Sequence, residues 1–330
     1  MDSEDSSDIV WNTLTEPAQQ AFIDRRSELT GLVHYTSFSG LEGIIRNEEL
    51  WFSPVAAMND FDEVTKGKQM LEDLSKPKEP LHEVVSAIIA KEALIGASFN
   101  EAYKASRGDD LFDTFVSCWS TCEIGTDSHD NLTMWRGYAS DGNGAAIVID
   151  PMNLGLAQLF ASHIVAYPVF YETEKQFVGR AKRSFSHFLK NLSELDSGLL
   201  MEHSAHVVSA FVDLCFQLAI THKHPGFQAE REWRFIWRRH GDFDEQFSQY
   251  VHLKVGPRGM YEYFCFPIKT NADVAPVDLD IRNLIKEITI GPTEDAYLKM
   301  QATASLLRTT GFDLGKTKVT QSNIPFRSTQ

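Results

Sequence analysis

The chain has 330 residues, of which 43% are hydrophobic, and its formal net charge is −15 at pH 7. A chain of this length can bury a large core, and its charge argues against nonspecific binding to polyanions, although a local basic cleft would still bind nucleic acid. The acidic N-terminus lacks the apolar stretch of a signal peptide, and Glu202, His206 and Asp213 interrupt the most apolar segment. We therefore expect a cytoplasmic protein without a membrane span.

Helical and strand patterns follow one another without regular βαβ alternation, which is typical of an α+β fold. Apolar periodicity predicts a helix that begins at about residue 40 and helices at 11–28, 63–74, 79–98, 131–139, 174–192, 196–222 and 294–310. It predicts strands at 32–35, 51–54, 111–122, 145–149, 164–171, 232–238, 250–255, 260–266, 285–290 and 316–320. No linker or repeat separates them, so we expect a helical extension at residues 1–29 and one α+β domain with helical insertions at 30–330.

The first informative segment is the strand near residue 32. Leu32, Val33 and Tyr35 suit a short buried strand, whereas His34 and Thr36 place polar groups on its opposite face. The segment would present an imidazole and hydroxyl groups at the start of a helix, where backbone N–H groups favour polar ligands. A buried structural histidine in a strand–helix unit explains the same residues.

The helix after this strand has its own start signal. Ser39 and Glu42 are spaced as a capping box, which predicts that the helix begins at about residue 40. Leu41, Ile44 and Ile45 form its apolar stripe.

The second informative segment runs from Glu230 to Phe235. In a strand, Glu230, Glu232 and Arg234 share one face, while aromatic residues occupy the other. One interpretation is a half-buried strand with a solvated Glu–Arg pair, which contributes little to stability. The other is a pair of carboxylates in a cleft, kept ionised and oriented by Arg234.

A predicted short helix at 131–139 carries two aromatic residues. Trp135 and Tyr138 are three apart and share a helical face, so they suit either stacking on a ligand ring or filling of the core. Gly142 and Gly144 follow in a turn that allows positive φ. A helix precedes this turn and a strand follows it, the reverse of a dinucleotide-binding loop.

No metal site is expected. Cys118 and Cys122 have no second close pair, and His222 and His224 lack further ligands at a suitable spacing. We expect the cysteines to be reduced thiols without a disulfide between Cys118 and Cys122. Residues 179–190 form the clearest basic cluster, which is typical of the solvated face of an amphipathic helix.

In order, the motifs resemble the bacterial domain-of-unknown-function family 2971. The resemblance covers about residues 30–327 through His-Tyr-Thr-Ser, Leu-x-x-Ile-Ile, Asn-Asp-x-x-Glu, Met-Trp-x-x-Tyr, Glu-x-Glu-Trp-Arg, Ile-Gly-Pro and Ser-x-Ile-Pro-x-Arg. These stand at His34–Ser37, Leu41–Ile45, Met58–Glu63, Met134–Tyr138, Glu230–Arg234, Ile290–Pro292 and Ser322–Arg327.

The order His, Tyr, Glu also resembles the ADP-ribosyltransferase superfamily. That resemblance implies a mixed-sheet core and NAD as substrate, with Glu232 facing the ribose and Glu230 orienting a nucleophile. It implies that His34 holds the ribose as part of the catalytic set. The NAD-binding residues would be His34, Tyr35, Thr36, Ser37, Asn59, Trp135, Tyr138 and Arg234.

The resulting hypothesis is an NAD-cleaving ADP-ribosyltransferase or NAD glycohydrolase, acting as a bacterial toxin or phage-defence effector. The acceptor would be a protein, a nucleic acid or water, and the chain would associate with itself or with a defence-system partner. The alternative is a non-enzymatic ligand-sensing or protein-interaction module with the same fold. For the enzyme, we expect His34, Tyr138 and Glu232 to converge on one site.

Overall fold

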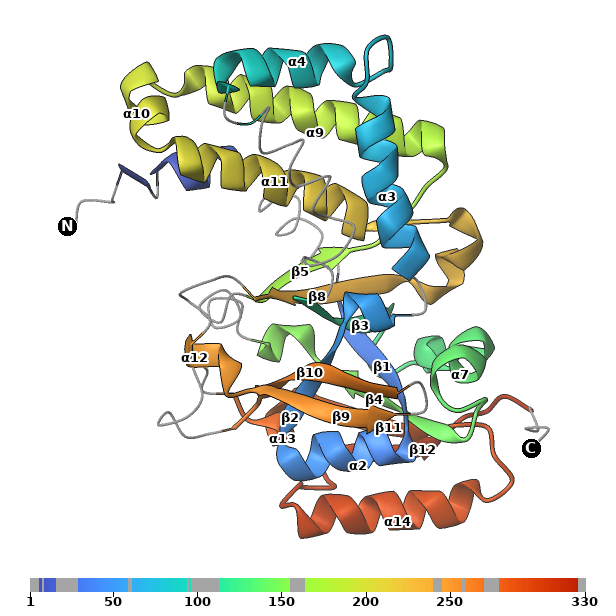
Figure 1. Cartoon of the computed structure of the whole chain (residues 1–330). Coiled ribbons are helices and arrows are strands. Elements are labelled where there is room, and N and C mark those ends of the chain that lie inside the picture. The colour runs from blue at the N-terminus through green and yellow to red at the C-terminus, as the bar shows by residue number, and fades with distance from the viewer. Residues whose placement is uncertain are drawn as a thin grey trace. The chain divides into compact units, whose positions relative to one another are not determined.

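The computed structural model describes residues 6–7, 9–15, 29–58, 61–93, 95, 113–154, 164–239, 245–256, 259–269 and 279–325 (Figure 1). The chain divides into two compact units. Unit 1 comprises residues 1–26, 58–112 and 168–228, and unit 2 comprises residues 27–57, 113–167 and 229–330. Each unit is thus built from three separated stretches of sequence. The expected single domain at 30–330 stays a prediction.

A ten-stranded sheet forms the framework of unit 2. Its main path runs β12-β11-β4-β1-β3-β2-β10-β9, and β8 joins β3 and β5 beside that path. Within this sheet, only the pairing of β11 with β12 is parallel among the described pairings with a stated direction. The strands are β1 (Gly31–Ser37), β2 (Glu49–Pro54), β3 (Thr114–Cys122), β4 (Gly144–Ile149), β5 (Ile164–Pro168), β8 (Glu232–Arg238), β9 (Val251–Gly256), β10 (Gly259–Pro267), β11 (Ile285–Ile290) and β12 (Lys318–Gln321). This mixture of strands and helices agrees with the expected α+β class.

The two faces of this sheet are covered by different helices. Val33 and Tyr35 of β1 pack with Trp135 of α7 (Leu132–Tyr138), and we call their side the α7 face. The opposite side, which we call the α2 face, carries His34 and Thr36, because successive residues of a strand alternate. The further helical segments of unit 2 are α2 (Phe38–Asn47), η1 (Val55–Ala57), η2 (Asp127–His129), η3 (Pro151–Asn153), α12 (Glu245–Ser248), α13 (Ile281–Leu284) and α14 (Ala296–Thr309).

The start of α2 corrects the predicted capping box. Ser37, not Ser39, is the N-cap, and its hydroxyl accepts a hydrogen bond from the Gly40 N–H at 3.1 Å. The Ser39 hydroxyl lies 2.9 Å from that of Ser37. The strand reaches Ser37 in an extended conformation, so Ser37 is the residue whose geometry suits a cap. The predicted apolar stripe of this helix is buried.

The turn before β4 contains the predicted left-handed glycine. Gly142 has φ of 86°, as expected, but Ser140 and Asp141 are also left-handed at 50° and 52°. Gly144 has a different role, because a Cβ there would lie 2.3 Å from the Thr36 carbonyl oxygen. It allows β4 to approach β1 closely.

Unit 1 is built mainly from helices around its own apolar cluster. Val10 and Leu14, from the helical residues 9–15, join that cluster, and the Asn191 amide donates to the Thr13 carbonyl at 2.7 Å. A Cβ on Gly67 would lie 2.9 Å from the Ala219 carbonyl oxygen, so two helices cross closely there. The elements are α3 (Phe61–Leu74), α4 (His82–Lys91), β6 (Phe170–Tyr171), α9 (Glu174–Glu194), α10 (Ser197–Glu202), α11 (Ser204–Ile220), β7 (His222–Lys223) and η4 (Pro225–Glu230), which extends into unit 2.

Two predicted elements of this part of the chain are divided in the structure. The expected helix at 196–222 is interrupted at His203 and ends before His222, which lies in β7. The expected strand at 164–171 breaks at Val169, giving β5 in the large sheet and β6 beside β7. His224 lies outside β7, so it does not share a strand face with His222. Among the described residues, no helix combines the length and apolarity needed to cross a membrane.

Candidate functional site

The charged face of β8 is buried, which corrects the expected half-buried strand. Glu232 is 6% exposed and Arg234 is 0% exposed. The aromatic residues of the strand lie on the other face, which is buried as well. Glu232 pairs in register with Ser120 and Arg234 with Cys118 on the neighbouring strand β3. The interpretation as a solvated Glu–Arg pair is therefore wrong. Charges at this depth are costly unless they are paired and hydrogen-bonded.

Arg234 binds Glu232 through two parallel hydrogen bonds. Its Nε donates to Glu232 Oε1 at 2.8 Å, and its Nη2 donates to Oε2 at 3.2 Å. This fork geometry is the strong form of an Arg–carboxylate pair, and it fixes the plane of the carboxylate. A carboxylate offers about four acceptor positions, so the two bonds from Arg234 leave capacity for other donors.

Glu230 is held by a hydrogen bond from α7, the helix that covers this face of the sheet. The Tyr138 hydroxyl, on α7, donates to Glu230 Oε1 at 3.0 Å, and Glu230 is 5% exposed. Arg231 between the two glutamates is left-handed, with φ of 46°, where η4 meets β8. The two carboxylates thus lie close along the chain, each with a different donor.

An unpartnered hydroxyl lies beside this pair. Ser120 is opposite Glu232 in the β3–β8 register and opposite Val33 in the β1–β3 register, so it lies on the α7 face. Its Oγ is buried, and no described group hydrogen-bonds to it. A buried hydroxyl without a partner costs free energy, so this atom is a candidate contact for a ligand.

His34 lies on the opposite face of the sheet from Glu232. Val33 is opposite Ser120, which is opposite Glu232, so the next residue, His34, points to the α2 face. Its ring lies 5.1 Å from the Trp119 ring, and its Nδ1 donates to the Cys118 carbonyl at 2.9 Å. The expected convergence of His34 with Tyr138 and Glu232 is therefore wrong, because the sheet separates them.

Burial sets the protonation state of His34. It lowers the pKa of the imidazole below its usual value, and the hydrogen bond to the Cys118 carbonyl only partly opposes this effect. The ring is thus neutral at neutral pH, with Nδ1 protonated.

The other residues expected to bind NAD on β1 have structural partners. The Tyr35 hydroxyl donates to the His129 carbonyl, and its ring meets the Trp135 ring edge-on at 5.1 Å. Thr36 packs at the start of α2, where a Cβ on Gly40 would meet its hydroxyl, and Ser37 caps that helix.

Trp135 is fully buried, which contradicts its expected role in stacking on a ligand ring. It is 0% exposed, and its Nε1 donates to Asp130 Oδ1 at 2.7 Å. Its aromatic face is part of the core of unit 2. Asn59, expected to bind the cofactor, lies outside the described residues, as do Asp60 and part of the terminal Ser-x-Ile-Pro-x-Arg motif.

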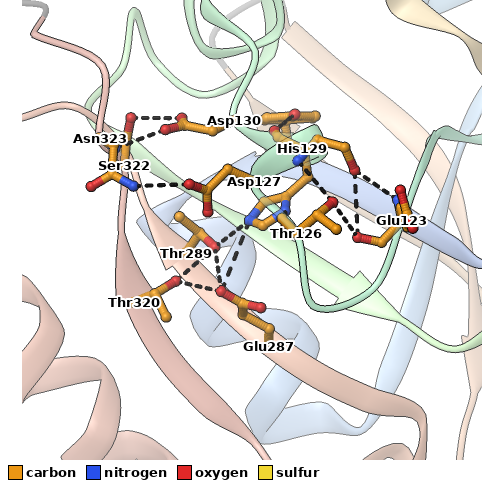
Figure 2. A network of polar contacts seen from close by, with 12 residues as sticks. Glu123, Thr126, Asp127, His129, Asp130, Glu287, Thr289, Thr320, Ser322 and Asn323 are labelled. Atoms are coloured by element: carbon orange, nitrogen blue, oxygen red, sulfur yellow. Dashed lines mark hydrogen bonds and ion pairs between the residues drawn. The ribbon is translucent and has the colours of Figure 1, made fainter.

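Asp130, just before α7, is bound to the segment that follows β12 (Figure 2). Besides the Trp135 indole, it accepts hydrogen bonds from the Ser322 hydroxyl at 2.6 Å and from the Asn323 N–H at 2.7 Å. Asp127 accepts a bond from the Asn323 amide at 3.2 Å. The terminal segment after β12 is thus tied to the start of the helix that carries Tyr138.

A second part of the same network is buried around His129 (Figure 2). Its Nε2 lies 2.8 Å from the Thr289 hydroxyl and 3.9 Å from Glu287 Oε1. The Thr320 hydroxyl donates to Glu287 at 2.6 Å, which links β12 to β11. These polar contacts hold the edge of the sheet against η2.

Ser120, Asp130 and His129 were not among the predicted site residues. Ser120 is one of four hydroxyl-bearing residues in β3, and nothing in that strand indicates which residue lies opposite it. Asp130 precedes the N-cap of the Trp135 helix and Ser322 begins the terminal motif, but no sequence pattern indicated that the two residues form a hydrogen bond.

The cysteines are free thiols. Burial raises the pKa of the Cys122 thiol to about 12 and that of Cys265 to about 11, so neither forms a thiolate readily. Within the described ranges, no group of three or more His, Cys, Asp or Glu residues is arranged to hold a metal ion.

Comparisons with known proteins bear on one part of the chain. No curated protein and no solved structure matches it. Residues 134–235 match the model of a family described as "Protein of unknown function (DUF2971)". The matched segment contains Tyr138, Glu230, Glu232 and Arg234, so the resemblance to this family of unknown function is supported for the residues that form the buried charged site.

Proposed function

We propose that the protein cleaves the bond between nicotinamide and ribose in NAD, using the side chains on the α7 face. The observation that carries the proposal is the pair of buried carboxylates, Glu230 and Glu232, beside the unpartnered hydroxyl of Ser120. Cleavage of this bond develops positive charge on the ribose, as in glycoside hydrolysis. Fixed carboxylates in a water-poor setting are suited to stabilise such charge.

In this proposal, Glu232 faces the developing oxocarbenium ion, and Arg234 holds its carboxylate in one orientation. Ser120 offers a hydrogen bond to a ribose hydroxyl. The electrons of the broken bond leave with nicotinamide, and a nucleophile forms the new bond to the ribose. Glu230, oriented by Tyr138, accepts the proton that the nucleophile loses. His34 has no part, because it lies on the other face.

The second candidate is a non-enzymatic module that binds a ligand without turnover. Arg234 occupies both oxygens of Glu232, and this pairing offsets the negative charge that the reaction would use. The same contacts suit a rigid binding site equally well. Nicotinamide release distinguishes the two functions.

The test is to incubate the protein with NAD and measure free nicotinamide by chromatography. For the enzyme, we expect release by the wild type and a loss of about 10²–10³ in rate for Glu232→Gln. Glu42→Gln is the matched control, because Glu42 is exposed and pairs only with Arg46 among described contacts. If the wild type releases no nicotinamide but its thermal midpoint rises with NAD, the binding module is the better function.

Ser120→Ala separates the site from its structural background. If the Ser120 hydroxyl has only a structural role, its removal should leave the stability of the fold unchanged or raise it, because a buried polar group without a hydrogen-bond partner is eliminated. For an enzyme, the same variant loses turnover while its unfolding midpoint stays equal or rises. A Ser120→Ala protein with wild-type nicotinamide release would remove this hydroxyl from the site.

A further inference from the structure

The outward face of α9 carries only positive charge over most of its length. Between Glu174 and Glu194 the helix contains no acidic residue, although the chain has 46 acidic residues against 31 basic ones. Its exposed cations are Lys175, Lys182, Arg183 and Lys190. Solvated helices usually mix charges of both signs, because like charges three or four residues apart repel.

These cations lie on one side of the helix. At 100° per residue, the four cations fall within about one third of the circumference, with Gly179 and Ser186 between them. We call these six residues the α9 basic face. Phe177, Phe185 and Phe188 lie on the opposite side, in the core of unit 1. Lys190 has one described acidic partner, Glu194 at 3.7 Å, at the end of the face.

Nothing in the described part of the chain requires residue 179 to be glycine. It lies in the interior of a 21-residue helix, where glycine is less stable than alanine. Among the described residues, a Cβ there would meet only Arg183 Nη1, at an ordinary contact distance of 3.5 Å, and the φ of Gly179 is not positive. Neither packing nor backbone conformation therefore requires it. A glycine in the middle of a cationic face lets a partner approach the helix backbone closely.

We propose that the α9 basic face binds the phosphodiester backbone of a nucleic acid. Lys175, Lys182 and Lys190 are seven and eight residues apart, which places them about 10–12 Å from one another along the helix axis. Together they span about 22 Å, a length over which one strand of a duplex presents about six phosphates. Ser186 adds a hydroxyl donor of the kind that contacts phosphate oxygens.

The composition of this face favours a phosphate backbone over other anionic partners. A membrane-bound amphipathic helix inserts its apolar side, whereas the apolar side of α9 is buried in its own unit. A protein interface is typically anchored by buried aromatic residues, and the α9 basic face has none. This proposal does not depend on NAD cleavage.

The experiment measures binding of the whole protein to a labelled duplex and to a labelled single strand of about 20 nucleotides, by fluorescence anisotropy, from about 50 to about 200 mM salt. The test variant combines Lys175→Gln, Lys182→Gln and Lys190→Gln. The control combines Lys66→Gln, Lys316→Gln and Lys318→Gln, three exposed lysines outside this face that give the same change in net charge.

We expect the test variant to lose affinity at least tenfold relative to the control. Its slope of log K against log salt should fall by about 2.7 on duplex DNA, because three phosphate contacts are lost. Absence of wild-type binding at low salt overturns the proposal, as does an equal loss in both triple variants. Binding to phosphatidylserine vesicles, but not to nucleic acid, would assign the face to a membrane surface instead.

Gly179→Leu tests the close approach separately. Leucine is the better helix former, so the melting temperature should rise while affinity for nucleic acid falls. A variant that is stabilised and binds as wild type overturns the role of Gly179.

Discussion

At the residue scale, the consequence of changing Glu232 depends on Arg234. Glu232→Gln leaves a fully buried guanidinium without its charged partner, and removal of one member of a buried ion pair costs about 3–5 kcal/mol. The buried bidentate pair therefore predicts that Glu232→Gln is destabilised as well as impaired in activity.

A double substitution keeps the test informative. Replacing both partners by apolar residues of similar size is often nearly neutral, so Glu232→Leu combined with Arg234→Met should be more stable than Glu232→Gln. Urea unfolding of the three proteins measures the difference. If the single variant is as stable as the wild type, the pair contributes little. The double variant then still tests whether nicotinamide release needs a charge at position 232.

His34 should make stability depend on pH. Its folded pKa lies below the usual value of 6.5, so between these two values the unfolded chain binds a proton that the folded protein does not. The stabilisation that comes from neutral His34 is complete above pH 6.5. It is lost as the pH falls through the pKa of His34 in the folded protein.

The matched variant is His34→Gln, which can still donate to the Cys118 carbonyl but does not titrate. We expect the wild type to lose more stability than this variant when pH falls from about 7.5 to about 5.5. Urea unfolding at several pH values measures both. Parallel curves for the two proteins would show that His34 is not held neutral by burial.

At the scale of elements, Asp130 joins α7 to the segment after β12. Asp130→Ala removes the acceptor of the buried Trp135 indole and of the Ser322 hydroxyl, so we expect a loss of about 2–3 kcal/mol. Amide hydrogen exchange should increase at residues 318–324, because those contacts hold the segment.

Asp130→Asn is the control for shape. The amide keeps one acceptor oxygen for the indole but loses the charge, so the variant should lie between the wild type and Asp130→Ala. If Asp130→Ala unfolds within about 0.5 kcal/mol of the wild type, these hydrogen bonds do not determine the position of α7.

At the scale of the whole molecule, the order in which the chain contributes segments to the two units limits which fragments of the protein can fold alone. The six segments alternate between the two units, so the chain passes from one to the other five times. The family-matched residues 134–235 contain β4, β5 and only the first four residues of β8. They lack β1 and β11, which pair with β4, and β3, which pairs with β8.

We therefore expect a fragment of residues 134–235 to show no cooperative thermal transition by circular dichroism, in contrast to the full chain. A strand without its neighbours leaves backbone groups unpaired and one apolar face exposed. A sharp melting transition in the fragment would mean that the family match marks an independent domain.

Most of the described helices and strands could be predicted from local sequence patterns. Periodicity located β1, β4, β8 and the long helix α9, because hydrophobic spacing is a local property that survives burial. It also identified Gly142 as a left-handed turn residue and indicated that Glu232 and Arg234 share a face. These features depend on residues only a few positions apart.

The placement of distant strands against one another could not be predicted in this way. The β1–β3–β8 register puts Ser120 beside Glu232 and leaves His34 on the opposite face, and a shift of one residue would reverse that outcome. Packing on both faces of β8 buried the charge pair, which excludes the solvated interpretation that its alternating pattern had left open. Register and burial depend on contacts between residues far apart in the chain, so the motifs along the sequence did not predict which of their side chains would meet.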